Sequence, residues 1–222
     1  MNVIIGDSRV AGLKYLHPLK LIFEDIWSKP GCSITQCTSL VEDNLIFHHP
    51  PLTNLKTHFY IFAGICDLTT MLRAKNYQEV VFYGHPTTVE DCMSVIDATS
   101  DEIVKLGAVP IFCTIPPLHL LTWNTLRLEQ GKTSVLKHKE KYPEMQSSLE
   151  SAVQVVNSLI VQKNAERHLA TPTLHTCMAR SKNKKIYHLY KMLPDGCHPG
   201  EEMTHKMVSS FQRAVSLNSD QH

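Results

Sequence analysis

Three short runs of β-branched and aromatic residues constrain the fold of this chain more than any other feature. They are NVII at 2–5, HFYIFAG at 58–64 and AVPIFCTI at 108–115, and each ends at, or is followed directly by, glycine or proline. Short apolar runs bounded by turn residues are typical of buried parallel strands. We therefore expect three strands whose last residues reach one edge of a sheet.

Helical patterns separate these runs. Apolar residues recur at spacings of three and four between residues 89 and 106, and the pattern stops at Gly107, a residue type common at helix C-termini. A second amphipathic pattern covers residues 149–160, and TPTLHTC at 171–177 is a weaker strand candidate. The alternation predicts a doubly wound parallel sheet with helices on both faces. Because ligands bind beyond the carboxyl ends of such strands, the informative segments are 6–12, 28–35, 64–70 and 114 onward.

The length of 222 residues suits one α/β domain. We expect that domain over residues 1–216, with an insertion at about 116–143 and a flexible tail at 217–222. The insertion is polar and aromatic, and two interpretations remain open: a surface excursion or a substrate lid. Within it, Trp123 and the leucines at 118, 120 and 121 are candidates to line a substrate pocket, although leucines at this spacing often only pack a loop.

Charge and cysteine content narrow the function classes. The formal net charge is +1, which gives no overall attraction to nucleic acid or anionic lipid. The seven cysteines form no CxxC motif, so we expect buried free thiols, no structural metal and no cofactor. We find no signal-peptide pattern and no apolar stretch of about 18 residues, so we expect a cytoplasmic or intracellular location. The sequence indicates no oligomeric state.

The tripeptide Gly6-Asp7-Ser8 follows the first expected strand and allows several interpretations. A phosphate-binding loop is excluded, because the spacing from Gly6 to Gly12 is wrong and no lysine and hydroxyl follow Gly12 directly. A turn that caps the next helix is a second interpretation, because Gly, Asp and Ser are common in turns and at helix N-termini. The third interpretation makes Ser8 a nucleophile.

Near the other end of the chain, the segment LPDGCHPGEEM favours the nucleophile interpretation. Asp195 and His198 are three residues apart, close enough for the carboxylate to orient the imidazole. A serine activated by a histidine that an acid orients is the general triad arrangement. A capped loop, in which Asp195 only binds backbone amides, remains the alternative for this motif.

With these motifs the sequence resembles the SGNH or GDSL-type hydrolases, a group of esterases, lipases, acyl hydrolases and carbohydrate deacetylases. The family carries four short sequence blocks, which this chain matches in the same order over residues 2–216. The matches are Gly6-Asp7-Ser8, Gly31 in KPGCSI, Gly64-Ile65-Cys66-Asp67 for the block Gly-x-Asn-Asp, and Asp195 to His198. The resemblance implies a three-layer α/β/α sandwich with a parallel, flavodoxin-like sheet, and hydrolysis of a carboxyl ester.

The resemblance also implies a role for each matched residue. Ser8 would be the nucleophile, His198 the general base and then acid, and Asp195 the residue that orients it. The oxyanion hole would consist of the backbone amides of Ser8 and Gly31 together with the side chain at position 66. The supporting residues would be Asp7, Gly64 and Asp67.

Two positions depart from the family pattern. Cys66 replaces the asparagine of the third block, and because a thiol is a weak donor, the oxyanion hole should be weakened. Two other interpretations of Cys66 are a nucleophile in its own right and a small buried side chain at the end of a strand. Arg9 stands where many members have leucine, and we interpret it either as a solvated helix residue or as a group that favours an anionic substrate.

The alternative from another function class is a catalytically weak or inactive SGNH-like module that binds RNA or a protein partner. The stretch 180–191 combines arginine and lysines with two tyrosines, a mixture that can bind RNA or another polyanion. The joint presence of Ser8, Asp195 and His198 is the reason to favour an enzyme that acts on a small-molecule, lipid or sugar ester.

Overall fold

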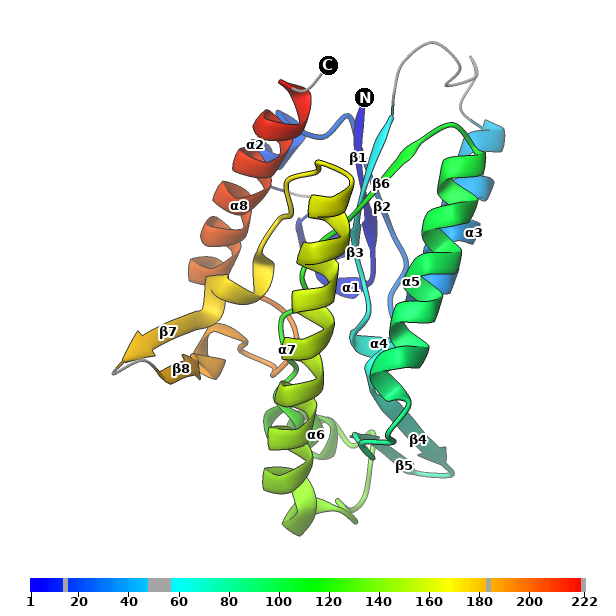
Figure 1. Ribbon diagram of the computed structural model, residues 1–222. Coiled ribbons are helices and arrows are strands. Elements are labelled where there is room, and N and C mark those ends of the chain that lie inside the picture. Colours follow the sequence, from blue (N-terminus) through cyan, green and yellow to red (C-terminus); the bar gives the residue numbers. More distant parts are fainter. Residues whose placement is uncertain (14–15, 48–56, 183–184, 221–222) are drawn as a thin grey trace.

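A parallel four-stranded sheet forms the centre of the computed structural model, which describes residues 1–13, 16–47, 57–182 and 185–220 (Figure 1). The strand order is β2-β1-β3-β6, and all three pairings are parallel. Their bounds are Asn2–Gly6 (β1), Asp25–Ser28 (β2), His58–Phe62 (β3) and Val109–Phe112 (β6). The three strands expected from the apolar runs are thus confirmed, and β2 adds a fourth at the edge.

Helices cover both faces of this sheet because successive strand residues point to opposite sides. Val3 and Ile5 of β1 pack into one apolar core, whereas Ile4 between them packs into the other. The first core lies under α3 (Ile34–Phe47), α5 (Thr88–Lys105) and α7 (Tyr142–Glu166). The second lies under α1 (Ser8–Leu13), α2 (His17–Lys20) and α8 (Glu201–Ser219). The predicted α/β/α sandwich is confirmed.

An antiparallel hairpin follows β3 and α4 (Ile65–Leu68), and the strand runs in the sequence do not predict it. Its strands are β4 (Thr70–Ala74) and β5 (Tyr77–Val81). Figure 1 shows it at the end of the molecule where the parallel strands finish. The hairpin therefore adds a wall beside the sheet edge at which we expect the chemistry.

The expected insertion at 116–143 contains α6 (Leu120–Glu129) and a 3-10 turn at Lys139–Lys141. Asn124 fastens α6 to the hairpin, because its side-chain amide both accepts from the Val80 amide and donates to the Val80 carbonyl, each at 2.8 Å. This segment is therefore built onto β5 rather than extending freely over the surface.

Two predictions were wrong: a strand at 171–177 and the end of the domain at 216. Residues 174–178 form a 3-10 helix instead of a strand, because the Pro172 carbonyl accepts from the amides of Thr114 and Leu174 and holds a tight turn. Helix α8 continues to Ser219, beyond the predicted domain end at 216. The buried Asn218 anchors that last turn by accepting from the Ala170 amide and donating to the Ala170 carbonyl and the Tyr60 hydroxyl.

The basic stretch 180–191 includes strands β7 (Ala179–Lys182) and β8 (Lys185–His188), which form a second antiparallel hairpin. Residues 183–184 and the side chains of 180–188 lie outside the described part of the chain, so RNA binding by this stretch stays a prediction.

All seven cysteines are free, and five of them are buried. None of the helices in the described ranges combines the length and apolar character needed to span a bilayer.

Candidate active site

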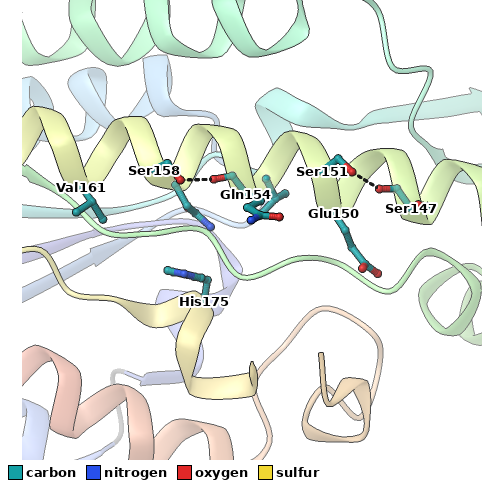
Figure 2. A pocket seen from close by; sticks show the side chains of 9 residues that line it. Ser147, Glu150, Ser151, Gln154, Ser158, Val161 and His175 are labelled. Atoms are coloured by element: carbon teal, nitrogen blue, oxygen red, sulfur yellow. Dashed lines mark hydrogen bonds between the residues drawn. The ribbon is translucent and has the colours of Figure 1, made fainter. Parts of the chain in front are cut away.

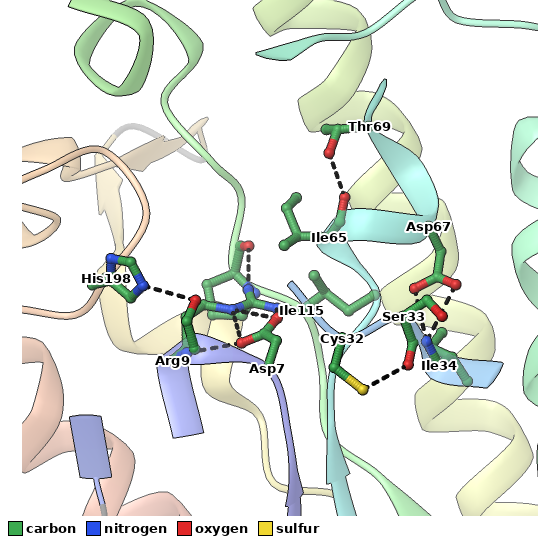
Figure 3. Close-up of polar contacts among 12 residues, drawn as sticks. Asp7, Arg9, Cys32, Ser33, Ile34, Ile65, Asp67, Thr69, Ile115 and His198 are labelled. Carbon is green, nitrogen blue, oxygen red and sulfur yellow. Dashed lines mark hydrogen bonds and ion pairs between the residues drawn. The ribbon is translucent and has the colours of Figure 1, made fainter. Parts of the chain in front are cut away.

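The two ends of the chain meet at the carboxyl edge of the sheet. Ser8 is the first residue of α1, directly beyond β1, and His198 lies in the loop before α8. His198 Nε2 lies 2.8 Å from Ser8 Oγ, and His198 Nδ1 lies 2.5 Å from Asp195 Oδ2. In Figure 3 the His198 ring is directed toward the start of α1. The structure thus brings Ser8, His198 and Asp195 into one hydrogen-bonded chain.

The loop from Asp195 to His198 folds around the aspartate. Asp195 Oδ1 accepts from the amides of Cys197 and His198 at 2.9 and 2.7 Å. Burial raises the pKa of Asp195, but hydrogen bonds from the His198 ring and from these amides outweigh it and lower the pKa to about 2. The carboxylate is therefore ionised at neutral pH and faces the imidazole as an acceptor.

Gly196 allows this loop to pack against the segment at the start of α6. Its φ is +84°, and an added Cβ would lie 2.7 Å from the backbone nitrogen of Trp123 and 2.8 Å from the His119 carbonyl oxygen. The Gly196 carbonyl accepts from the His119 amide at 2.7 Å. As a result the Trp123 ring lies beside the His198 ring, with centroids 5.8 Å apart.

A pocket of about 480 Å³ opens at this contact. Its lining brings together six residues expected from the sequence: Asp7, Ser8, Gly31, Cys66, Trp123 and His198. Leu118 also lines it, whereas Leu120 is buried in the core and Leu121 is exposed elsewhere. Trp123 and Leu118 of the 116–143 segment therefore line the pocket beside Ser8, and substrate binding by them stays a prediction.

Gly64 and Asp67 are not among the residues that line the pocket. The Asp67 carboxylate accepts from the Ile34 amide at 3.0 and 3.2 Å, which ties α4 to the loop that carries Gly31 (Figure 3). Gly64 has φ +119°, and a Cβ there would lie 2.4 Å from Ile115 Cδ1. Both residues position the loops around the pocket without lining it.

Cys66 is exposed, so the interpretation as a buried side chain was wrong. Protein atoms around the thiol displace water that would solvate a thiolate, and this desolvation, with the charge of Asp7, raises its pKa to about 11. The thiol is therefore protonated at neutral pH, and a protonated thiol is a poor nucleophile.

Arg9 follows neither interpretation derived from the sequence. It is buried, and its Nε and Nη2 donate to the Asp7 carboxylate while its Nη1 donates to the Pro116 carbonyl (Figure 3). Its guanidinium also lies over the Phe62 ring, 4.6 Å from the centroid. The side chain therefore stabilises the turn before Ser8 and is not available to bind substrate.

Sequence reasoning missed four pocket residues that the hairpin and α6 carry: Met71 and Arg73 of β4, Val80 of β5 and Arg127 of α6. They come from the hairpin and helix that the apolar patterns do not indicate. No motif marks them, because their place at the pocket depends on contacts between β5 and α6.

A second pocket, of about 510 Å³, lies along α7 and includes His175 (Figure 2). Two of its three serines bond within the helix, since Ser151 Oγ donates to the Ser147 carbonyl and Ser158 Oγ to the Gln154 carbonyl, each at 3.0 Å. Its acid, Glu150, accepts from the Tyr190 hydroxyl. These pairings do not activate a nucleophile, so the smaller pocket at Ser8 is the better candidate.

No protein-family model and no curated protein matches this sequence. Solved structures do match: a GDSL-like lipase from Bacteroides thetaiotaomicron superposes with a TM-score of 0.60 at 14% identity, over 97% of this chain and 87% of that one. The chain has the SGNH/GDSL hydrolase fold. A lipase/acylhydrolase from Enterococcus faecalis gives a TM-score of 0.51 at 13% identity, over 97% and 95% of the two chains. In this SGNH fold, the pocket at Ser8 lies beyond the carboxyl ends of β1, β2 and β3.

Proposed function

We propose that this chain is a serine hydrolase of the SGNH type that cleaves carboxyl esters, with Ser8, His198 and Asp195 as its catalytic triad. The observation that carries the proposal is the contact between Ser8 Oγ and His198 Nε2, two residues that line the pocket, with Asp195 on the other ring nitrogen. The fold shared with a GDSL-like lipase and with a lipase/acylhydrolase supports the same reaction class.

The reaction begins when His198 Nε2 takes the hydroxyl proton of Ser8 as the oxygen attacks the ester carbonyl. Asp195 keeps the remaining ring proton on Nδ1 and stabilises the imidazolium that forms. His198 then donates its proton to the leaving alcohol, which gives an acyl-serine. Water, deprotonated by the same imidazole, attacks the acyl-serine and releases the acid.

Backbone amides would stabilise the negatively charged oxygen of the tetrahedral intermediate. Among the described residues, no backbone hydrogen bond uses the amides of Ser8 or Gly31 as donors, which leaves both free to serve the pocket. The third contribution would come from position 66, where a thiol is a weak donor. Loss of one oxyanion donor costs about 10²–10³ in kcat, so we expect a slow enzyme.

Hydrolysis of p-nitrophenyl acetate and butyrate tests this proposal. We expect turnover by the wild-type protein and its loss in Ser8→Ala and in His198→Ala. Asp195→Asn should keep a measurable rate that is lower than that of the wild type. Ser151→Ala, a serine of α7 whose hydroxyl donates to a helix carbonyl, is the matched control and should keep the wild-type rate. Equal turnover by folded Ser8→Ala and wild type would refute the proposal.

A further inference from the structure

Arg127 is held at the wall of the Ser8 pocket by two contacts. Its Nη1 donates to Gln78 Oε1 at 3.0 Å, and its guanidinium carbon lies 4.7 Å from the centroid of the Trp123 ring. Stacking on an aromatic ring leaves the edge of a guanidinium free to donate to an anion. Trp123 itself lies beside His198, so the charge of Arg127 is one indole ring away from the imidazole.

Arg73 lies on the same wall. It is paired with Gln78 across the β4–β5 hairpin, and directly paired residues of an antiparallel ladder point to the same face. Met71 and Val80, which lie two residues along each strand, also line the pocket, as this alternation requires. Arg73, the cross-strand neighbour of Gln78, and Arg127, its hydrogen-bond partner, therefore line the same pocket from two different elements.

In the described part of the chain, no carboxylate pairs with either of these two charges. The nearest acid along the hairpin, Glu79, points to the opposite face and accepts from Tyr77 and Tyr142. Asp7, the acid that lines the pocket, already pairs with Arg9. The pocket therefore presents uncompensated positive charge.

The position of Trp123 decides which half of an ester would meet this charge. In a serine hydrolase the leaving alcohol receives its proton from the histidine and so lies on the histidine side of the serine. Trp123 is in contact with His198, and Arg127 stacks on Trp123. We propose that the pocket selects esters whose leaving alcohol carries a negatively charged group, such as a carboxylate or phosphate, bound by Arg127 and Arg73. This inference rests on the proposed function.

Two pairs of esters test the inference. The first pair is the acetate of para-hydroxyphenylpropanoate and its methyl ester, in which two methylene groups insulate the reacting oxygen from the charge. The second pair, phenyl hydrogen adipate and methyl phenyl adipate, places the charge on the acyl side. We expect kcat/KM to be about tenfold higher for the charged member of the first pair, the range of one hydrogen bond to a charged group, and no preference in the second.

Substitutions assign the preference to the arginines. In Arg127→Gln and Arg73→Gln the charged-to-neutral ratio of kcat/KM should fall toward one, whereas Arg127→Lys should keep part of it. Arg213→Gln, the same change at an exposed residue of α8, should keep the wild-type ratio. Equal kcat/KM for the first pair, or a preference for the charged adipate, would overturn the inference while the proposed function stood.

A binding measurement separates this inference from the proposed function. The Ser8→Ala protein is titrated with para-hydroxyphenylpropanoate and with its methyl ester, and binding is followed by NMR. We expect tighter binding of the anion, lost in the Ser8→Ala, Arg127→Gln double variant. If no ester is hydrolysed above the rate of Ser8→Ala, the proposed function fails, and equal binding of the two ligands would overturn the anion site as well.

Discussion

Arg9 donates through both Nε and Nη2 to the carboxylate of Asp7, and both side chains are buried directly beside Ser8. Asp7 also accepts from the Arg9 amide at 2.9 Å, so the pair closes the turn between β1 and α1. Removing one partner of such a pair leaves a buried charge uncompensated. The position of Ser8 therefore depends on a charge pair that the GDS motif alone does not indicate.

Arg9→Leu introduces the residue that many proteins with this motif carry. We expect it to lower the free energy of unfolding by about 3–5 kcal/mol, because the Asp7 carboxylate loses its buried partner. Urea denaturation measures the change. Asp7→Asn combined with Arg9→Leu should recover most of the loss, since no buried charge then remains. A single variant as stable as the wild type would show that the pair has no such role.

Glu79 is a second buried charge, and it ties the hairpin to α7. It accepts from the hydroxyls of Tyr77 and Tyr142, from the His138 ring and from the amides of residues 137 and 138. Burial raises the pKa of Glu79, but these hydrogen bonds outweigh it and lower the pKa below its ordinary value. The ionised carboxylate therefore stabilises the wall that carries Arg73.

We expect Glu79→Gln to lower the free energy of unfolding by about 1.5–3 kcal/mol at pH 7, the range for hydrogen bonds to a charged group. The pKa of Glu79 is lower in the folded state than in the unfolded state. The difference in the free energy of unfolding between the wild type and Glu79→Gln is therefore full above the unfolded-state pKa of about 4.3, and it shrinks as the pH falls through the lower folded-state pKa. Urea denaturation at several pH values measures it. Glu129→Gln, at an exposed residue of α6, should show neither effect.

Cys66→Asn introduces the asparagine that the third block of the SGNH hydrolases carries. If the thiol limits the oxyanion hole, the amide should raise kcat by up to about 10²-fold, because it adds a full donor where charge develops. Steady-state hydrolysis of p-nitrophenyl acetate measures kcat, and Cys66→Ser, a hydroxyl of similar size, should give a smaller gain. An unchanged or lower kcat in a folded Cys66→Asn protein would count against the weak-donor account.

Much of the site could be predicted because it follows from strand ends and local spacing. Ser8, Gly31 and Cys66 each follow a strand of the parallel sheet, and such ends share one edge. Asp195 and His198 are three residues apart, so their contact is a local property of the loop. These relationships need only the order of elements along the chain.

The hairpin, α6 and the arginines that they bring to the pocket could not be predicted in the same way. The strand Thr70–Ala74 is largely exposed and has no run of apolar residues, so nothing in its pattern separates it from a loop. Its partner β5 is held by Asn124, Tyr142 and residues 137–138, all far along the chain. Arg73 and Arg127 therefore reach the pocket through contacts that local patterns do not encode.

The central claim is that His198 activates the hydroxyl of Ser8, and covalent labelling tests it most directly. The purified protein is treated with a fluorophosphonate, and the labelled residue is identified by mass spectrometry of its peptides. We predict one phosphonyl group per chain, attached to Ser8, and no labelling of folded Ser8→Ala or His198→Ala. An unlabelled wild-type protein, or a label on another residue that persists in Ser8→Ala, would contradict the account.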